Sequence, residues 1–212
     1  MKTYIFDLDD TLVQSMFVWE TVIDEIFDRL GIETSFQAHK EHFIKMTASE
    51  VCVYIAETYP IEQTPDQLYL DLMQRVNVHY AQDVKLTEGV IPFFEQCKKE
   101  GIQMAVMTSN NEKTAQIVLN KYHLVPYLSA LFSMDSMKTS KRDPDMFKYV
   151  LDTLHATPQE TTVFEDSMYA IENATSMGMH CIGMVNDFNR KDFKEHHIPI
   201  IKDFRELLKE KA

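Results

Sequence analysis

The start of the chain is dominated by the stretch Phe6-Asp7-Leu8-Asp9-Asp10-Thr11-Leu12, which closes an apolar run that begins at Thr3. The run from Thr3 to Leu8 is short and almost continuously apolar, which favours a strand buried on both faces, as in a parallel sheet. Asp7 and Asp9 stand at i and i+2, so an extended chain places their carboxylates on the same side. The sequence therefore predicts a parallel strand that ends in two acids pointing the same way.

Strand and helix signals alternate from about residue 86 to the end of the chain. We expect strands over residues 103–107, 130–134, 161–164 and 181–185. We expect helices over residues 89–100, 111–122, 143–155 and 168–177. The stretch Asp203-Phe204-Arg205-Glu206 resembles a capping box, which predicts that a last helix opens there. Such alternation is typical of a doubly wound parallel sheet, so the predicted fold class is α/β with a Rossmann-like core.

The segment between the first strand and this alternating part has a different pattern. Apolar residues recur at helical spacing up to Leu30, and Gly31 stands where a helix end favours positive φ. Thr64 followed by proline predicts another helix start, and no strand is expected in the segment. We therefore predict an α/β core formed by residues 1–14 and 85–212, and an inserted all-helical cap formed by residues 15–84.

Polar side chains follow the predicted strands at several separate points. They are Asp7 and Asp9 after the first strand, Thr108-Ser109-Asn110 after the second, Lys141 in the loop after the third, and Glu165-Asp166-Ser167 after the fourth. In sheets of this type, ligands bind beyond the carboxyl ends of the strands. We therefore expect these residues to converge on one crevice.

Two of these acids suit the covalent transfer of a phosphoryl group. A carboxylate with a reference pKa of about 3.9 is ionised at neutral pH and can attack without a base, which fits Asp7. Two crowded carboxyls resist being ionised together, so Asp9 can hold a proton for the leaving oxygen.

The other polar residues suit the neutralisation of phosphate charge. Magnesium takes oxygen ligands, often carboxylates with water and substrate phosphate, and Asp166, Asp7 and Glu165 are the candidate ligands. Lys141 adds a positive point charge. Thr108 and the backbone amides after it, beginning with Ser109, can hold the transferring oxygens.

These four stretches resemble the four motifs of the haloacid dehalogenase-like superfamily, in their usual order. The match is closest to its phosphatase and β-phosphoglucomutase-like branch, which carries a helical cap after the first motif. The resemblance implies that Asp7 is the nucleophile and that Asp9 is the general acid and base, with a backbone carbonyl on the metal. It implies that Thr108 and Lys141 bind the phosphoryl group, and that Asp166 holds Mg²⁺ with Glu165 assisting.

The chain departs from the usual motifs at three positions. Asp10 stands where glycine is commonest, Arg142 replaces the first proline of the Lys-Pro-x-Pro-Asp run, and Ala170 stands where glycine is frequent. Lys138 is a second lysine close to the third motif, although Pro144 and Asp145 favour Lys141 as the phosphate ligand. None of these departures alters a residue that carries the chemistry.

Composition limits the partners and the compartment. The net charge of −12 and a pI near 5.1 oppose binding to a nucleic-acid backbone. No apolar run approaches the length of a membrane span, and the N-terminus does not resemble a signal peptide. The three cysteines have no metal-binding spacing, which favours a reduced, cytoplasmic chain. The expected partner is a small phosphorylated metabolite, and neither its identity nor the oligomeric state follows from the sequence.

The sequence leaves other functions to be weighed against a phosphomonoester phosphatase. A sugar phosphomutase would share every motif, but β-phosphoglucomutase-like relatives have a histidine twelve residues after the nucleophile, and here that position is Trp19. Haloacid dehalogenases and phosphonatases lack the second aspartate, so Asp9 argues against both. A non-catalytic binding module would have lost the nucleophile, a metal ligand or the lysine, and all are present. His39 and His42, at i and i+3, are expected to be surface side chains rather than metal ligands.

Overall fold

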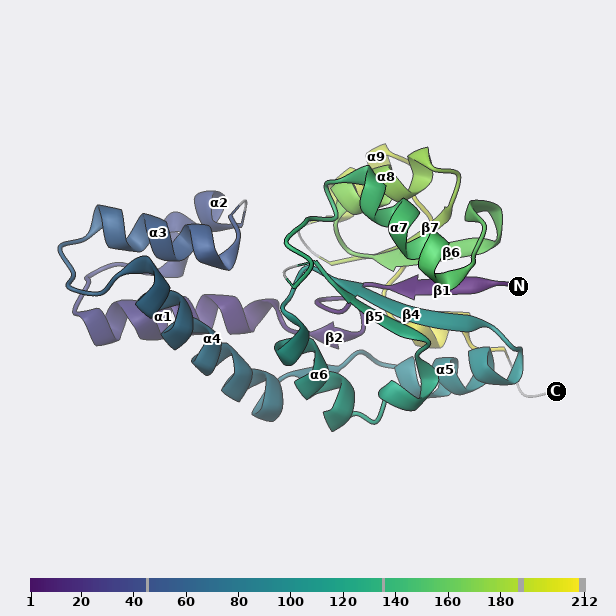
Figure 1. Cartoon of the computed structure of the whole chain (residues 1–212), viewed down its shortest axis with the longest axis horizontal. Coiled ribbons are helices and arrows are strands. Elements are labelled where there is room, and N and C mark those ends of the chain that lie inside the picture. The colour runs from purple at the N-terminus through teal and green to yellow at the C-terminus, as the bar shows by residue number, and fades with distance from the viewer. Residues whose placement is uncertain (45, 135, 187–188, 210–212) are drawn as a thin grey trace. The chain divides into compact units, whose positions relative to one another are not determined.

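A computed structural model describes residues 1–44, 46–134, 136–186 and 189–209 (Figure 1). The chain forms two compact units. The first, here called the core unit, consists of Met1–Gln14 together with Lys85–Ala212, and the second, the helical unit, consists of Ser15–Val84.

The core unit is organised around a six-stranded sheet in the order β5-β4-β1-β6-β7-β8. Its strands are β1 (Thr3–Phe6), β4 (Gln103–Thr108), β5 (Ala130–Ser133), β6 (Thr161–Glu165), β7 (His180–Met184) and β8 (Ile200–Ile201). Every neighbouring pair is parallel. The first strand lies in the interior, between β4 and β6, which places the end of the opening apolar run among the other strand ends.

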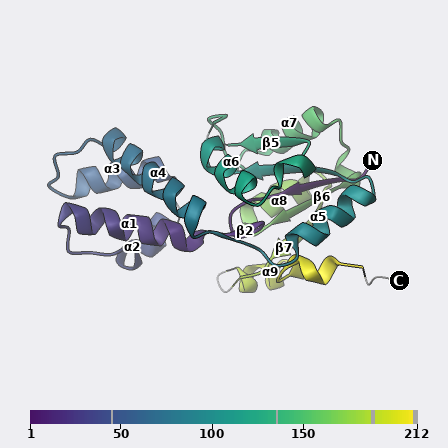
Figure 2. The same ribbon diagram turned by 90° about the horizontal axis from the view of Figure 1, so that it is seen from below.

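Helices cover both faces of this sheet (Figures 1 and 2). They are α5 (Val90–Lys99), α6 (Glu112–Lys121), α7 (Pro144–Leu154), α8 (Met168–Ser176) and α9 (Arg190–Glu195). The pair α5 and α6 lies on one face, and α7, α8 and α9 lie on the other. Strand, helix and strand succeed one another as the sequence pattern predicts, so the predicted α/β, Rossmann-like fold class is confirmed.

Alternation along β1 supplies both halves of the core. Ile5 points to the face of α7, α8 and α9 and packs into an apolar cluster that includes Phe147 and Phe193. Phe6 points to the opposite face, where its ring lies 4.8 Å from that of Phe164 and 4.9 Å from that of Phe94. Burying one such side chain is worth about 1.5–3 kcal/mol, so packing on both faces holds the end of β1 firmly in place.

The helical unit consists of four helices in its described residues. They are α1 (Met16–Leu30), α2 (Phe36–Phe43), α3 (Ala48–Thr58) and α4 (Pro65–Gln82). Gly31 ends α1 with φ +66°, and Thr64 begins α4 through a reciprocal capping box with Gln67, as the sequence signals predict. Side chains at helical spacing on α1, among them Val22 and Ile26, are buried in the interior of this unit.

A chain of ion pairs joins α1 to α4 along one side of the helical unit, and we call it the α1–α4 ion-pair chain. Its members are Arg29, Asp71, Arg75, Glu25, His79 and Asp83, in that order of contact. The closest of these contacts is 2.7 Å, from His79 Nδ1 to Asp83 Oδ2. All six side chains are partly open to solvent.

Several short elements have no clear signal in the sequence. Val13–Gln14 (β2) and Lys85–Leu86 (β3) form a two-stranded antiparallel pair at the point where the chain leaves and re-enters the core unit. Strand β8 and helix α9 likewise lie beyond the predicted elements. Each is only two to six residues long, which is too short for apolar periodicity to reveal it.

The predicted last helix is wrong. Asp203 accepts a hydrogen bond from Arg205 N at 3.0 Å, but the segment after it, Phe204–Leu207, is a single 3₁₀ turn. Glu206 does not close a capping box, because its carboxylate accepts from Lys202 N at 2.7 Å, one residue before the cap. The turn serves to bury Phe204 against the rings of Phe6 and Phe93.

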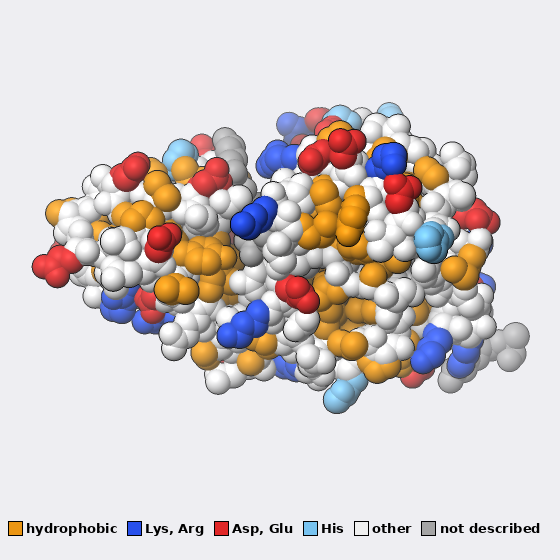
Figure 3. Space-filling model, in the orientation of Figure 1, with side chains coloured by type: hydrophobic (Ala, Val, Ile, Leu, Met, Phe, Trp, Pro, Cys, Tyr) orange, Lys and Arg blue, Asp and Glu red, His pale blue; other side chains and the backbone are white. Residues whose placement is uncertain are grey.

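The three cysteines are buried and unpaired. Burial raises the pKa of the Cys52 and Cys97 thiols to about 12, and it also raises the pKa of Cys181. On the face drawn in Figure 3, Lys and Arg side chains are interspersed with acidic ones and form no continuous basic stripe. No helix in the described part of the chain is long and apolar enough to cross a membrane.

Candidate active site

Three strand ends meet at the carboxyl edge of the sheet. Phe6, the last residue of β1, is in register with Val106 of β4 on one side and with Phe164 of β6 on the other. The next residues along β1 and β6, Asp7 and Glu165, are therefore neighbours. Asp7 is also tied to β6 by its backbone, since Asp7 N donates to Phe164 O at 2.9 Å.

Lys141 lies between these two acids and is buried. Its ammonium group donates to Asp7 Oδ1 and to Glu165 Oε2, the latter at 2.7 Å, and its side chain is only 2% exposed. Asn173 on α8 donates to the Lys141 carbonyl at 2.8 Å, which fixes the loop that carries the lysine. Lys138 is exposed, so Lys141 is the lysine that reaches the strand ends.

The carboxylates of Asp7, Glu165 and Asp166 form one group, here called the carboxylate cluster. One oxygen from each lies within 4.8 Å of the other two, and among the described residues this is the group whose spacing suits a metal ion. Asp7 Oδ2 is buried, and no hydrogen-bond donor in the described part of the chain reaches it. The cluster therefore contains a carboxylate oxygen that faces no protein partner.

Charge in the carboxylate cluster is unbalanced. Burial raises the pKa of Asp7 well above its usual value, and the neighbouring Glu165 adds to the rise while Lys141 opposes it. Burial and Glu165 also raise the pKa of Asp166. Burial alone would lower the pKa of Lys141, but the facing carboxylates of Asp7 and Glu165 outweigh burial and raise it. The lysine therefore stays charged, and it neutralises only part of the acidic charge around it.

The acidic loop after β6 is held by its own hydrogen bonds. Glu165 Oε1 accepts from the backbone N–H groups of Asp166 and Ser167 at 3.2 and 3.0 Å. Asn189 donates from Nδ2 to the Asp166 carbonyl at 2.8 Å. These contacts fix both the turn and the direction of the Asp166 side chain, whose Oδ1 accepts from the Ser167 hydroxyl at 3.1 Å.

Asp9 lies beside the loop that follows β4. Asn110 Nδ2 donates to Asp9 Oδ2 at 3.3 Å, and Asn110 N donates to the buried Thr108 hydroxyl at 3.1 Å. Asp10 has φ +55°, which explains why glycine is common at this position and why aspartate, which tolerates the left-handed region, can replace it. The structure thus places Thr108 and Asp9 on adjoining loops linked by Asn110.

Ser109 contacts a residue that the sequence analysis did not single out. Burial raises the pKa of the Tyr169 phenol, in the first turn of α8, and the neighbouring Ser109 side chain opposes the rise. The Arg142 guanidinium lies over the Tyr169 ring, 4.3 Å from its centroid. Ser109 and Arg142 are both exposed, so this group borders solvent.

Sequence reasoning also missed the two asparagines that support the site. Asn189 follows β7, so the rule that polar residues after strands matter would have selected it. Asn173 has no comparable signal, because it lies within α8, where an asparagine is ordinarily a surface residue.

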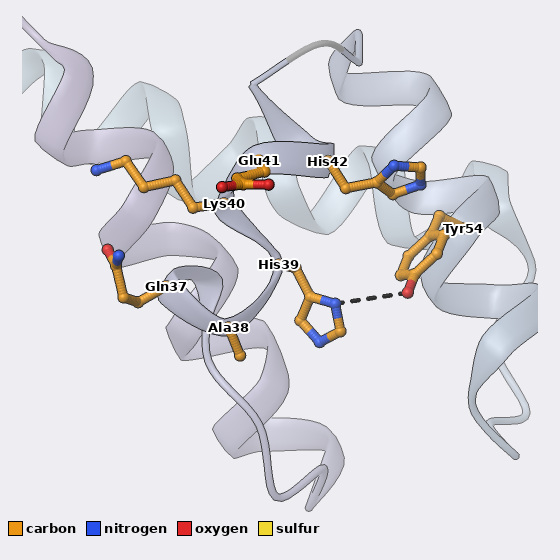
Figure 4. A pocket seen from close by; sticks show the side chains of 7 residues that line it. All are labelled: Gln37, Ala38, His39, Lys40, Glu41, His42 and Tyr54. Atoms are coloured by element: carbon orange, nitrogen blue, oxygen red, sulfur yellow. Dashed lines mark hydrogen bonds between the residues drawn. The ribbon is translucent and has the colours of Figure 1, made fainter. Parts of the chain in front are cut away.

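The helical unit contains a separate depression of about 650 Å³ (Figure 4). It is lined by Gln37, Ala38, His39, Lys40, Glu41, His42 and Tyr54. The His39 ring contacts the hydroxyls of Thr34 and Tyr59 at 3.0 Å and that of Tyr54 at 3.4 Å. His39 is therefore half-buried and held by hydroxyl groups rather than being a plain surface side chain, and it does not belong to the metal-type group of the described residues.

The chain belongs to the haloacid dehalogenase-like hydrolase family, whose profile matches residues 4–184. The match confirms the family resemblance that the four motifs indicate. Among curated relatives, a phosphorylated carbohydrates phosphatase from Thermotoga maritima is 24% identical over 89% of this chain and 88% of its own length. A phosphoglycolate phosphatase from Pseudomonas putida is also 24% identical, over 98% of this chain and 78% of its own length.

Solved structures show the same fold. CbbY from Rhodobacter sphaeroides in complex with phosphate superposes with a TM-score of 0.84 at 18% identity, covering 98% of this chain and 96% of its own. A HAD hydrolase from Entamoeba histolytica superposes with a TM-score of 0.81 at 22% identity, again over 98% of this chain and 96% of its own. The family match and the two curated phosphatases, rather than these structures, confirm the prediction of a hydrolase of the phosphatase type.

Proposed function

We propose that this protein is a Mg²⁺-dependent phosphohydrolase that cleaves small phosphomonoesters through an aspartyl-phosphate on Asp7. The single observation that carries the proposal is the buried Asp7 carboxylate. Lys141 holds one of its oxygens, and the other faces no protein donor among the described residues. A carboxylate fixed in this way is an oriented, ionisable nucleophile with one oxygen left for a ligand.

The residues of the carboxylate cluster fit a magnesium ion. The ion takes oxygen ligands, and Asp7, Asp166 and Glu165 offer carboxylate oxygens within 4.8 Å of one another. Asp9 would add its backbone carbonyl, as the family resemblance implies. The excess of acidic charge over the single Lys141 is the imbalance that a divalent cation corrects. When bound, the ion would neutralise phosphate charge and so reduce the repulsion between the substrate and Asp7.

The first step of the proposed reaction is attack by Asp7 on phosphorus, with loss of the alcohol. Asp9 gives its proton to the leaving alkoxide oxygen, and the bond from phosphorus to that oxygen breaks as the bond to Asp7 forms. Lys141, Thr108 and the backbone amide of Ser109 bind the transferring oxygens. Asn110, which donates to Asp9, positions the acid in this step.

The second step is hydrolysis of the aspartyl-phosphate. Asp9, now ionised, takes a proton from a water molecule that attacks phosphorus, and Asp7 leaves as a free carboxylate with release of inorganic phosphate. The role of the helical unit as a cap that excludes bulk water remains a prediction, as does a cytoplasmic location. A mutase would instead return the phosphoryl group to a sugar. Trp19, half-buried on α1, cannot offer the imidazole of the mutase-type relatives, which favours the phosphatase.

The proposal is tested with p-nitrophenyl phosphate and the purified chain. We expect phosphate release that depends on added MgCl₂, stops with EDTA and returns with excess magnesium. Acid-quenched enzyme trapped during turnover should carry one phosphoryl group on the peptide that contains Asp7, as seen by mass spectrometry. Full activity in metal-free buffer, or a phosphoryl group on another residue, would refute the mechanism.

A further inference from the structure

The loop after β5 carries two adjacent basic residues with opposite environments. Lys141 is buried and paired with Asp7 and Glu165. Arg142, the next residue, is exposed, and among the described residues its guanidinium is in no ion pair but lies over the Tyr169 ring. Lys141 is thus paired with the acids of the carboxylate cluster, whereas the charge of Arg142 lies at the surface and can pair with a ligand.

Tyr169 connects Arg142 to the phosphate-binding loop. The Arg142 guanidinium carbon lies 4.3 Å from the centroid of the Tyr169 ring, and Ser109 is among the groups that influence the pKa of the Tyr169 phenol. Tyr169 also lies in the first turn of α8, which follows directly on Glu165 and Asp166 of the carboxylate cluster. The guanidinium therefore lies over a ring that begins the helix after the acidic loop, and Arg142 itself follows Lys141 directly in the chain.

A guanidinium that lies over an aromatic ring keeps its N–H donors free to bind a ligand. The ring covers one face of the planar group, while its N–H donors point outward in the plane and fit a carboxylate or a phosphate. Stacking also restricts the long arginine side chain, which reduces the ordering that a ligand would otherwise impose. In a chain with a net charge of −12, a cation held at this place without an acidic partner is suited to bind an anion.

The geometry points to Arg142 as a specificity-determining residue that binds a second anionic group on the substrate, with Tyr169 as its positioning residue. This inference rests on the proposed function. It narrows the substrate class to small phosphomonoesters with another carboxylate or phosphate close to the scissile phosphate. The Arg142 N–H groups donate to that second anion, while Lys141 and the loop at Ser109 bind the phosphoryl group that is transferred.

The test uses pairs of ligands that differ only in the second anion. Phosphoglycolate is compared with 2-hydroxyethyl phosphate, and fructose 1,6-bisphosphate with fructose 6-phosphate, as competitive inhibitors of p-nitrophenyl phosphate hydrolysis. For at least one pair, the doubly anionic ligand should have an inhibition constant about tenfold or more below that of its partner, as expected for a charge-assisted hydrogen bond. The pair that shows the difference distinguishes a carboxylate from a phosphate.

Variants then assign the preference to the two residues. Arg142→Gln should reduce the ratio of the two inhibition constants to about one. Tyr169→Leu should reduce this ratio partly, because it removes the aromatic ring under the guanidinium. Tyr169→Phe keeps the ring and should retain most of the ratio. Lys99→Gln removes an equal charge from the exposed end of α5, before β4 begins and so at the opposite edge of the sheet, and should leave the ratio unchanged.

The outcomes separate this inference from the proposed function. If the wild-type protein does not hydrolyse p-nitrophenyl phosphate, the proposed phosphatase function is rejected. Normal hydrolysis without a preference in either pair would overturn only the role of Arg142. A preference that survives Arg142→Gln, or that falls equally in Lys99→Gln, would show that the second anion is bound elsewhere or by the general field of the protein.

Discussion

The carboxylate cluster and the α1–α4 ion-pair chain are built from the same kinds of side chain but differ in burial and in charge balance. In the core unit, three acids surround one base, and the side chains of Asp7, Glu165 and Lys141 are at most 5% exposed. In the helical unit, three acids face three bases when His79 is protonated, and every side chain is partly exposed. Balanced, hydrated charges need nothing further, whereas a buried excess of negative charge is relieved by a bound cation or by protonation.

Burial and charge balance distinguish a candidate binding site from a group of structural ion pairs. Proximity of acids and bases occurs in both places, and the ion-pair chain contains more contacts. Each group contains a buried carboxylate oxygen without a hydrogen-bond donor among the described residues, but Oδ2 of Asp71 lies 3.0 Å from the Arg29 guanidinium, whereas Oδ2 of Asp7 has no basic partner. Such a group costs free energy unless a ligand satisfies it, so its presence indicates a binding role.

The largest expected effect is on turnover, in Asp7→Asn. The amide keeps the shape of the carboxylate but is not an anionic nucleophile, so kcat should fall by about a thousandfold or more. Folding should persist, because the substitution also removes a charge from an overcrowded group. Phosphate release and a far-UV circular dichroism melt check both parts. Retention of more than about a tenth of the wild-type rate, under about 1.4 kcal/mol of barrier, would show that the nucleophile is another residue.

The next largest effect is on stability, in Lys141→Met. Removing one partner of a buried ion pair leaves uncompensated charge, and a loss of about 3–5 kcal/mol is expected in metal-free buffer. Urea denaturation followed by circular dichroism measures the loss. Lys138→Met is the matched control, since Lys138 is exposed on the same loop and should change the free energy of unfolding by no more than about 0.5 kcal/mol. Equal effects in the two variants would contradict the burial argument.

Magnesium itself should stabilise the folded chain without any substrate. A ligand that binds only the folded state contributes about 2.7 kcal/mol when its free concentration is a hundred times Kd. The midpoint of thermal unfolding should therefore rise with MgCl₂ in the wild type and rise much less in Asp166→Asn. Glu172→Gln, an exposed acid on α8, should keep the wild-type response. A similar rise in all three proteins would mean that magnesium acts as a general salt.

A much smaller effect is expected in the helical unit, in Arg75→Met. Arg75 contacts Glu25 at 3.0 Å and Asp71 at 3.2 Å, but these groups are partly hydrated, so the expected loss is at most about 1 kcal/mol. Trp19 is the only tryptophan and lies on α1, so its fluorescence during urea denaturation reports on this unit. If Arg75→Met lowers the free energy of unfolding as much as Lys141→Met does, the ion-pair chain and the carboxylate cluster do not differ in the way proposed.

The smallest effect is a pH dependence at His79. Burial lowers the pKa of His79, but its hydrogen bonds to Asp83 and Glu25 outweigh burial and raise it. The resulting stabilisation is complete below the unfolded pKa of about 6.5 and is lost as pH rises through the higher folded pKa. The Trp19-monitored midpoint should therefore decrease slightly from mildly acidic to mildly alkaline pH. In His79→Gln this slope should flatten, and an unchanged slope would assign it to other groups.

Much of the core unit could be predicted because strand ends in a parallel sheet are ordered by topology alone. The sequence predicts that Asp7 and Glu165 follow parallel strands and therefore share one edge of the sheet, and the structure adds that β1 and β6 are adjacent. For the lysine, Pro144 and Asp145 favour Lys141 over Lys138, but the burial of its side chain depends on how the loop folds. Only the structure shows that Lys141 is buried and that Asn173 holds its carbonyl.

Contacts between side chains on different loops and helices were beyond prediction. The sequence around Arg142 gives no sign of Tyr169 as its neighbour, and the guanidinium lies over that ring because the loop after β5 and the start of α8 meet in space. The 3₁₀ turn at Phe204–Leu207 is a second case in which contacts with distant residues determine the local structure. Its local sequence favours a helix, but burial of Phe204 among aromatic rings outweighs that preference.

The buried cysteines give each unit its own chemical reporter. Only the thiolate reacts quickly, so thiols with a raised pKa and no solvent access should resist alkylation in the folded protein. Cys52 lies in the helical unit, while Cys97 and Cys181 lie in the core unit. The rate at which each position is labelled, read by peptide mass spectrometry, therefore measures how often its own unit opens. The same property allows a single introduced surface cysteine to carry a spectroscopic probe without removal of the native three.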